Sequence, residues 1–302
     1  MLLITFQQVL KLFIFLLIGF LLRRYSVLPV TASGVLSLLE VNLFVPCLNF
    51  LTFSQNFTLE KLSGDLPLLA ASMISCLVTI AAGTFAGRHL SKDHYAQNLA
   101  VYSINMPNTG YVGAPLILAM FGSETLMRMQ LFCLPMSIYT YTVGYQLLMD
   151  RKGFSPRSLL SPALLAIFFG AVIGMCRIPL PSVLTDVLTS CSNCLGPIAM
   201  LLTGCLIAQF HFRDILCDPL IYKVIALRMI VVPLAVLSAC RAIGLSRDVL
   251  LILAAVYTMP TGLNTVIFPA SVGKDCHLGA GMACVSNTLG ILTIPLFFAL
   301  FL

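Results

Sequence analysis

Two short stretches rich in proline, glycine and asparagine decide the fold of this chain. They read Asn105-Met106-Pro107-Asn108-Thr109-Gly110 and Thr258-Met259-Pro260-Thr261-Gly262-Leu263-Asn264. Each stretch interrupts a long apolar segment near its middle, at 95–120 and at 247–271. Proline removes a backbone donor and clashes with the carbonyl one turn back, and glycine loosens the turn. We therefore predict that both segments are helices that break at these stretches.

The composition places the two broken helices in a membrane protein. The chain has 302 residues, of which 59% are hydrophobic and only 9% are charged. Soluble domains have about 25% charged residues, so an ordinary soluble protein is excluded. The high hydrophobicity also excludes disorder. The net charge of +6 is not gathered into a basic run, so the expected partner is the lipid bilayer and no nucleic acid.

Polar residues divide the chain into ten candidate transmembrane helices. Backbone groups in lipid must be satisfied within the segment, so each long apolar stretch is predicted to be helical. The predicted spans are 2–22, 31–53, 66–88, 95–120, 125–149, 158–177, 183–210, 219–240, 247–271 and 277–302. The predicted fold class is an all-α integral membrane protein, with its two breaks in the fourth and ninth spans.

The positive charges of the loops set the predicted orientation. Loops after odd-numbered spans contain nine Lys and Arg residues: Arg23, Arg24, Arg88, Lys92, Arg151, Lys152, Arg157, Arg213 and Lys274. Loops after even-numbered spans contain five: Lys61, Arg128, Arg177, Arg241 and Arg247. Because positively charged loops stay in the cytoplasm, ten spans leave both termini extracytoplasmic. We expect a multi-pass protein of the cell membrane, which is the plasma or inner membrane.

The two halves of the sequence match each other at a nearly constant offset. Matching residues lie 151 to 153 positions apart: Gly19 and Gly170, Pro46 and Pro197, Arg88 and Arg241, and Pro107 and Pro260. Five spans per repeat is an odd number, so the second copy must enter the membrane from the opposite side. We predict two inverted five-helix repeats, 1–150 and 158–302, joined by a short cytoplasmic connector at 151–157.

Inverted repeats with corresponding broken helices are typical of secondary transporters, whose substrate binds at the breaks. Half-helix N-termini at such a point carry partial positive charge, which suits an anionic group. The alternative is that the prolines only kink the helices for packing. The candidate substrate-binding residues in the two breaks are Asn105, Pro107, Asn108, Thr109, Pro260, Thr261 and Asn264.

The sequence of the fourth span closely resembles that of the auxin efflux carrier family. The resemblance lies in Pro107-Asn108-Thr109, Gly113-Ala114-Pro115-Leu116 and Ala119-Met120-Phe121-Gly122, and it continues in Phe44-Val45-Pro46 and from Pro260 to Pro295. The family includes plant PIN-type carriers and bacterial permeases for small organic acids. The connector at 151–157 is short where plant carriers often have a long hydrophilic insert, which favours the bacterial permease-type branch.

The resemblance implies an architecture and a mechanism. It implies a scaffold of helices 1, 2, 6 and 7 and a moving transport unit of helices 3–5 and 8–10, with helices 4 and 9 crossing at their breaks. It implies secondary active transport of small organic anions, such as mono- or dicarboxylates, by elevator-type alternating access. The family is often dimeric, which implies a homodimer through the scaffold helices.

Ionisable residues inside a membrane span are costly and are often functional. Arg228 lies about 15 Å into the eighth span at 1.5 Å per residue. It is interpreted either as the group that holds the substrate's anion or as a tie between helices through an ion pair or carbonyl contacts. Glu40 is a candidate for coupling to H⁺ or Na⁺, and otherwise pairs with a base or faces water. Lys11 is expected to snorkel to the interface, and Asn49 either lines the cavity or bridges two helices.

Other classes of protein find little support in the sequence. No Asp or His lies deep in a predicted span, so an intramembrane enzyme lacks its catalytic groups, and we assign no catalytic residue. The His residues lie in loops or at span ends without paired ligand spacing, which predicts no metal site and no cofactor. A channel-like protein, a sensor on the same fold and a carrier of a neutral solute stay open as alternatives.

Overall fold

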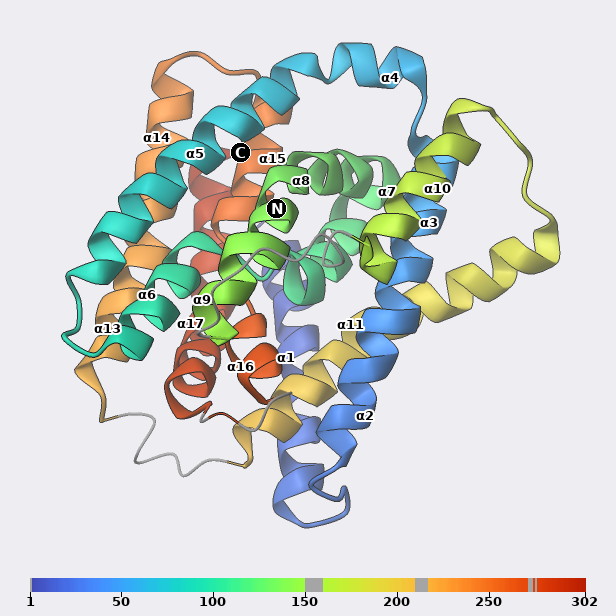
Figure 1. Cartoon of the computed structure of the whole chain (residues 1–302). Helices are drawn as coiled ribbons and strands as arrows, with labels where there is room; N and C mark the ends of the chain where they lie inside the picture. The colour runs from blue at the N-terminus through green and yellow to red at the C-terminus, as the bar shows by residue number, and fades with distance from the viewer. Residues whose placement is uncertain (1, 150–159, 210–216, 271–273, 275) are drawn as a thin grey trace.

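The computed structural model describes residues 2–149, 160–209, 217–270, 274 and 276–302, and Figure 1 shows how its helices are arranged. Within these ranges the chain is helical and forms no β-strand, which confirms the all-α fold class. One isolated bridge is the only β-type pairing among these residues. The predicted connector at 151–157 lies outside the described residues, and so do the predicted span ends at 158, 210 and 271.

Most helices of the first half follow the predicted spans to within a few residues, and a short helix at Leu59–Gly64 lies between the second and third spans. The second predicted span is one continuous helix in three parts, and the fourth is divided after α6. The elements are α1 (Leu2–Arg24), α2 (Ala32–Leu39), η1 (Glu40–Phe44), α3 (Val45–Asn56), α4 (Leu59–Gly64), α5 (Leu66–Arg88), α6 (His94–Asn105), η2 (Thr109–Gly113), α7 (Ala114–Phe132), α8 (Leu134–Tyr139), η3 (Thr140–Gly144) and α9 (Tyr145–Met149).

Helices of the second half follow the predicted spans in the same way. The eighth predicted span is continuous in three parts, and the ninth is divided after α15. The elements are α10 (Pro162–Met175), α11 (Ser182–Ile207), α13 (Pro219–Ala226), η5 (Leu227–Val231), α14 (Val232–Ala242), α15 (Arg247–Tyr257), α16 (Asn264–Ala270) and α17 (His277–Phe301).

Several of these helices are suited to crossing a membrane. Six in the described ranges are long and apolar enough: Phe6–Arg24, Ala32–Asn56, Leu66–Arg88, Ser182–Ile207, Pro219–Ala242 and His277–Phe301. A seventh is added if the bent pair Thr109–Phe132 and Leu134–Met149 counts as one span. Helices α6 and α15, with 12 and 11 residues, are each shorter than the roughly 20 residues of a span. The number and character of these helices support a multi-pass membrane protein.

Helix α7 contains the turn between the fourth and fifth predicted spans. Gly122 within it has φ 82° and ψ 179°, a backbone conformation that is not helical. Glycine adopts positive φ without the clash that a Cβ atom would cause. Residues 109–121 and 123–132 therefore belong to two different helical segments, which agrees with the predicted boundary between 120 and 125.

Wide π-helical turns precede three of the prolines. The turns η1, η2 and η5 end two residues before Pro46, Pro115 and Pro233 respectively. In each turn, the residue before the proline donates its N–H to the carbonyl five residues back, as Val45 does to Glu40. A proline ring clashes with the carbonyl four residues back, and a wider turn makes room for it. These prolines therefore shape their helices without ending them.

Two helix pairs pack with their backbones in contact. Helix α1 packs on α11, and α10 packs on α3 (Figure 1). A Cβ atom on Gly19 would overlap the carbonyl of Leu201, and one on Gly170 would lie 2.7 Å from the carbonyl oxygen of Phe50. Gly170 lies 151 residues after Gly19, and Leu201 lies 151 residues after Phe50. The two contacts are therefore related by the offset that the sequence repeat shows.

The core is centred on α15, in which every residue from Ile252 to Tyr257 is fully buried. Helices α7, α14 and α17 pack around it. By contrast, α5 exposes large apolar side chains such as Ile74 and Leu77. An exposed apolar face of this kind is suited to lipid, and the buried α15 brings the ninth-span break into the middle of the molecule.

Candidate functional site

The two broken helices meet at their breaks. Pro107 of the first break and Thr261 of the second are paired as an antiparallel bridge. Two backbone hydrogen bonds hold this pairing: Asn108 N–H to the Pro260 carbonyl at 2.8 Å, and Gly262 N–H to the Met106 carbonyl at 3.0 Å. Non-helical backbone at membrane depth must find partners within the protein. Each break supplies those partners for the other.

Asn108 starts the second half of the fourth span. Its side-chain Oδ1 accepts the N–H of Tyr111 at 3.1 Å, and Asn is among the residues that favour this capping role. The other end of the Asn108 amide, Nδ2, is buried and has no hydrogen-bond partner among the described residues. An unused donor therefore lies at the N-terminus of this half-helix.

Arg228 is fully buried. It faces the C-terminal ends of α6 and α15, which are the first halves of the two broken helices. Its guanidinium group donates to the carbonyl of Ile104, near the end of α6, at 3.3 Å. It also donates to three carbonyls at and after the end of α15: Val256 and Tyr257 at 3.3 Å, and Met259 at 3.2 Å. Carbonyls at a helix C-terminus carry partial negative charge, so one cation stabilises both ends.

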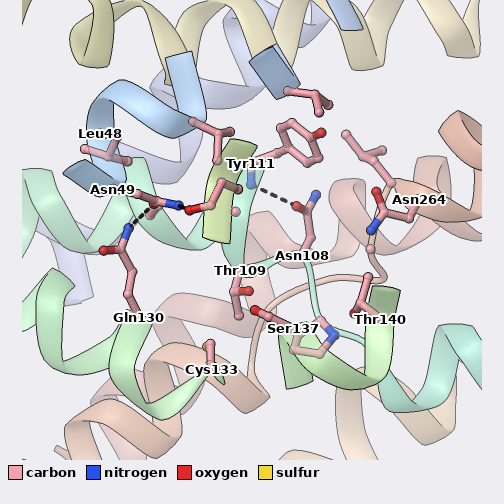
Figure 2. A pocket seen from close by; sticks show the side chains of 18 of the residues that line it. Leu48, Asn49, Asn108, Thr109, Tyr111, Gln130, Cys133, Ser137, Thr140 and Asn264 are labelled. Atoms are coloured by element: carbon pink, nitrogen blue, oxygen red, sulfur yellow. Dashed lines mark hydrogen bonds between the residues drawn. The ribbon is translucent and has the colours of Figure 1, made fainter. Parts of the chain in front are cut away.

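A cavity of ≈ 170 Å³ lies beside the crossing (Figure 2). Helices α3, α10 and α11 contribute to it, and so do the two breaks, η2, α8 and η3. Its polar lining consists of Asn49, Tyr102, Asn108, Thr109, Tyr111, Gln130, Ser137, Thr140 and Asn264. No Asp, Glu, Lys, Arg or His stands among the described residues that line it. The cavity therefore combines apolar walls with uncharged polar side chains.

Amide side chains lie on two sides of this cavity (Figure 2). On one side, Gln130 Nε2 donates to Asn49 Oδ1 at 2.8 Å. On the other, Asn264 Nδ2 donates to the Tyr102 hydroxyl at 3.0 Å, and Asn108 lines the same cavity. The amides come from the second, fourth, fifth and ninth predicted spans, so the cavity joins both halves of the sequence.

Two helix N-termini also line the cavity. Thr109 and Gly110 are the first residues of the helix that continues into α7, and Ala163 and Leu164 lie in the first turn of α10. N–H groups in a first turn lack intrahelical acceptors, and together they carry partial positive charge. This end of each helix can therefore accept an anionic group without a charged side chain.

Comparison with known proteins identifies the family of this chain. The model of the family described as "Membrane transport protein" matches residues 4–156 and residues 152–298. The chain belongs to this family. It is the auxin efflux carrier family that the fourth span predicts, and that prediction is confirmed.

Two relatives of this membrane transport protein come from archaea. An uncharacterized transporter of Methanocaldococcus jannaschii is 25% identical, and the alignment covers 97% of each chain. An uncharacterized transporter of Methanothermobacter thermautotrophicus is 23% identical, and the alignment covers 96% of each chain. The similarity therefore extends over essentially the whole length, including both breaks.

The predicted substrate residues of this membrane transport protein divide into two groups. Those that line the cavity are Pro107, Asn108, Thr109 and Asn264. Those that do not are Asn105, Pro260, Thr261 and Arg228. The second group builds the crossing: for example, the Thr261 and Ser286 hydroxyls are 2.9 Å apart. Asn105 Nδ2 donates to Thr84 Oγ1 at 3.3 Å, which ties α6 to α5.

Glu40, the predicted coupling residue, lies next to the cavity but does not line it. It is fully buried, and neither carboxylate oxygen has a hydrogen-bond partner among the described residues. The following residue, Val41, does line the cavity. Of the sequence-based alternatives for Glu40, the described residues show neither a paired base nor exposure to water.

Some lining residues were not singled out from the sequence. Gln130, Cys133, Ser137 and Thr140 follow one another at spacings of three, four and three, which places them on one helix face. This periodicity in the fifth span is the sequence signal that could have identified them as lining residues. Asn49 does both of the things considered for it: it lines the cavity, and its Nδ2 donates to the carbonyl of Ala163 at 3.2 Å. No group of three His, Cys, Asp or Glu in the described residues could hold a metal.

Proposed function

We propose that this membrane transport protein is a secondary active carrier of small organic anions, namely mono- or dicarboxylates. The observation that carries the proposal is the uncharged polar cavity at the crossing, with two helix N-termini in its wall. Each N-terminus is equivalent to about half a positive charge, which offsets part of the cost of bringing in an anion. The volume of ≈ 170 Å³ is below the roughly 300–1,000 Å³ of pockets for drug-sized ligands, which favours a small solute.

The proposed architecture is ten spans in two inverted five-helix repeats. Its support is that helices occur within each of the ten predicted stretches and that the packing of Gly19 on Leu201 corresponds to that of Gly170 on Phe50. Figure 1 also shows the turn from α1 to α2 at the bottom, while α4 and the turn from α14 to α15 lie at the top. Helices that cross the membrane in alternating directions require successive connections at opposite ends of the molecule.

The proposed mechanism is elevator-type alternating access. The scaffold consists of α1, α2–α3, α10 and α11, whose backbones are in contact in pairs. The moving unit consists of α5–α9 and α13–α17, which include both breaks. The cavity has walls from both units, so movement of one against the other would change the side to which it opens. A homodimer through the scaffold helices is part of the proposal, because α10 and α11 expose large apolar side chains such as Phe168 and Val183.

The proposed location is the cell membrane, with both termini extracytoplasmic. A test places single cysteines at Lys92 and Ser246, in a background without the exposed Cys176, Cys194 and Cys217. Lys92→Cys should require a membrane-permeant reagent in intact cells, whereas Ser246→Cys should react with an impermeant one. The reverse pattern would reject the orientation without affecting the site.

The substrate proposal is tested by thermal stabilisation of the purified protein across a panel of small carboxylates. A ligand at 100 times its dissociation constant stabilises by about 2.7 kcal/mol, which is measurable. Each acid is compared with its neutral amide, which is the matched control for charge. Stabilisation by acids alone supports an anion carrier. Stabilisation by the amides alone would instead support a carrier of neutral solutes, the alternative that the absence of charged lining residues favours.

Counterflow in proteoliposomes separates a carrier from a channel-like protein or a sensor. A carrier exchanges external labelled substrate against internal unlabelled substrate, so the label accumulates transiently. A channel shows no such stimulation, and a sensor moves no substrate. We propose no catalytic step, since the family is one of transport proteins.

Coupling to H⁺ or Na⁺ is assigned to Glu40. An ionised carboxylate without a partner is costly to bury, so this position favours exchange of a bound cation during the cycle. Its neighbour Val41 lines the cavity, which brings the exchange next to the substrate. The two ions are distinguished by the gradient, of H⁺ or of Na⁺, that drives accumulation.

A further inference from the structure

A second cavity lies between α1, α7 and α11. It is lined by apolar residues and by four polar ones: Gln8, Lys11, Ser192 and Asn193. Lys11 is exposed, and no carboxylate of the described residues pairs with it. A lysine in the middle of a membrane helix is therefore directed into a cavity, rather than only toward the interface as the sequence suggested.

The second cavity borders the cavity at the crossing. Leu48 and Leu195 are the two described residues that line both, and both are buried, at 3% and 2% exposure. The boundary continues on α7, where Ala114 lines the first cavity and Pro115 the second. The two spaces therefore share an apolar wall, which we call the leucine barrier after Leu48 and Leu195.

The two cavities meet near the proposed membrane midplane, since the residues of α11 that line them lie in the middle of that helix. The first has its α10 wall at Ala163 and Leu164, in the first turn of a helix that begins at the proposed cytoplasmic side. The second has its α1 wall between Gln8 and Phe15, in the central part of α1. Together the two cavities form a path that the leucine barrier interrupts.

We propose that the second cavity is a vestibule that attracts small anions through Lys11, and that the leucine barrier closes it from the substrate cavity. The proposal deepens the proposed function, since it concerns the same carboxylate path. Its physical basis is that an unpaired ammonium group in the wall of a cavity raises the local concentration of anions. The substrate cavity has no charged lining residue, so the full positive charge of the path lies at its entrance.

The test uses the fact that the chain contains no tryptophan. Phe15→Trp places a single fluorophore in the second cavity. Its quenching by iodide, a small anion, is compared with its quenching by neutral acrylamide in the purified protein. Lys11→Gln should lower the iodide quenching constant about threefold, the effect of one charge at roughly 6 Å in water. Lys11→Arg should restore it, and the acrylamide constant should stay unchanged in both.

Two matched reporters make the result specific. Phe168→Trp, on an exposed face of α10, and Ile167→Trp, in the first cavity, should show no dependence on Lys11. An iodide constant for Phe15→Trp that Lys11→Gln leaves unchanged rejects the vestibule. A parallel change in the acrylamide constant also rejects it, because the effect would then be structural. Neither readout requires transport. The vestibule can therefore be rejected while the proposed function stands, and the proposed function can be rejected while the vestibule stands.

The barrier is tested by passive iodide release from proteoliposomes. Leu195→Ala should raise the release severalfold above the unsubstituted protein, because it opens the wall between the cavities. Leu184→Ala, the same change at an exposed position of α11, is the control and should have no effect. Equal release from the two variants would reject the assignment of Leu195 to the barrier.

Discussion

Gly196 of α11 makes room for Pro115 at the start of α7: a Cβ atom on Gly196 would lie 2.9 Å from the Pro115 Cβ. Such a separation is too short for two carbon atoms, so the helices approach this closely only because position 196 has no side chain. Pro115 is the second residue of α7, which continues the helical turn that begins at Thr109 in the cavity wall. The contact therefore joins a proposed scaffold helix to the helix that carries the substrate residues.

We predict that Gly196→Val slows transport more than it weakens binding. The added methyl groups would push α7 away from α11, and overpacking of this kind costs about 1–3 kcal/mol. Counterflow should slow about tenfold or more, while stabilisation by substrate should occur at a similar concentration. Gly34→Val is the control, because nothing lies within 4 Å of a Cβ atom there. Equal slowing in both variants would show that the effect is not specific to the contact.

A second prediction concerns the unused donor of Asn108. Asn108→Asp keeps the acceptor that caps Tyr111 N–H, but replaces the Nδ2 donor with a negative charge. The affinity for a carboxylate should fall about tenfold or more, since like charges repel strongly in a low dielectric. Asn108→Ala should have a smaller effect. The measurement is the carboxylate concentration that gives half-maximal thermal stabilisation.

Asn98→Asp is the matched control for that experiment. It adds the same charge to α6, the other half of the same broken helix, at a half-buried position outside the cavity lining. A similar loss of affinity in both variants would point to net charge alone. Unchanged affinity in Asn108→Asp would place the anion elsewhere and contradict the proposed site.

Local sequence signals were sufficient to locate the breaks and to predict that they belong to one site. Pro107 and Pro260 remove backbone donors in the middle of apolar segments, and no tertiary information is needed to see that a helix breaks there. Which side chains line the cavity depends on how the helices are rotated. Thr261 therefore turns toward Ser286 of α17, while Asn264 lies in the cavity wall.

The role of Arg228 shows what the sequence could not decide. Its depth in the eighth span was predictable from the spacing of apolar residues. Its partners were not, because the carbonyls of Ile104 and Met259 reach it only through the crossing of α6 and α15. From the sequence, an anion-binding arginine and a carbonyl-binding arginine look the same. The contacts favour the second interpretation, which gives the next prediction.

We predict that Arg228→Lys lowers stability and affects mono- and dicarboxylates equally. Lysine keeps the charge but loses the planar group that reaches several carbonyls at once, and a lost hydrogen bond to a charged group costs about 1.5–3 kcal/mol. The readout is the free energy of unfolding in detergent, together with half-maximal substrate concentrations. Arg241→Lys is the control, because Arg241 is exposed near the end of α14 and makes one hydrogen bond to the Leu300 carbonyl. A larger loss for the dianion would support direct contact with the substrate instead.

The last prediction separates coupling from binding at Glu40. Glu40→Gln preserves the shape of a side chain that is fully buried without hydrogen-bond partners among the described residues, but it removes the charge that a cation would neutralise. Counterflow of the carboxylate should persist, because exchange needs no net movement of the coupling ion. Accumulation driven by the H⁺ or Na⁺ gradient should be lost, since the gradient then has no group on which to act. Glu60→Gln, on the exposed helix α4, should leave both activities unchanged. Accumulation that survives Glu40→Gln would assign the coupling to another group, and loss of counterflow as well would make Glu40 part of the binding site.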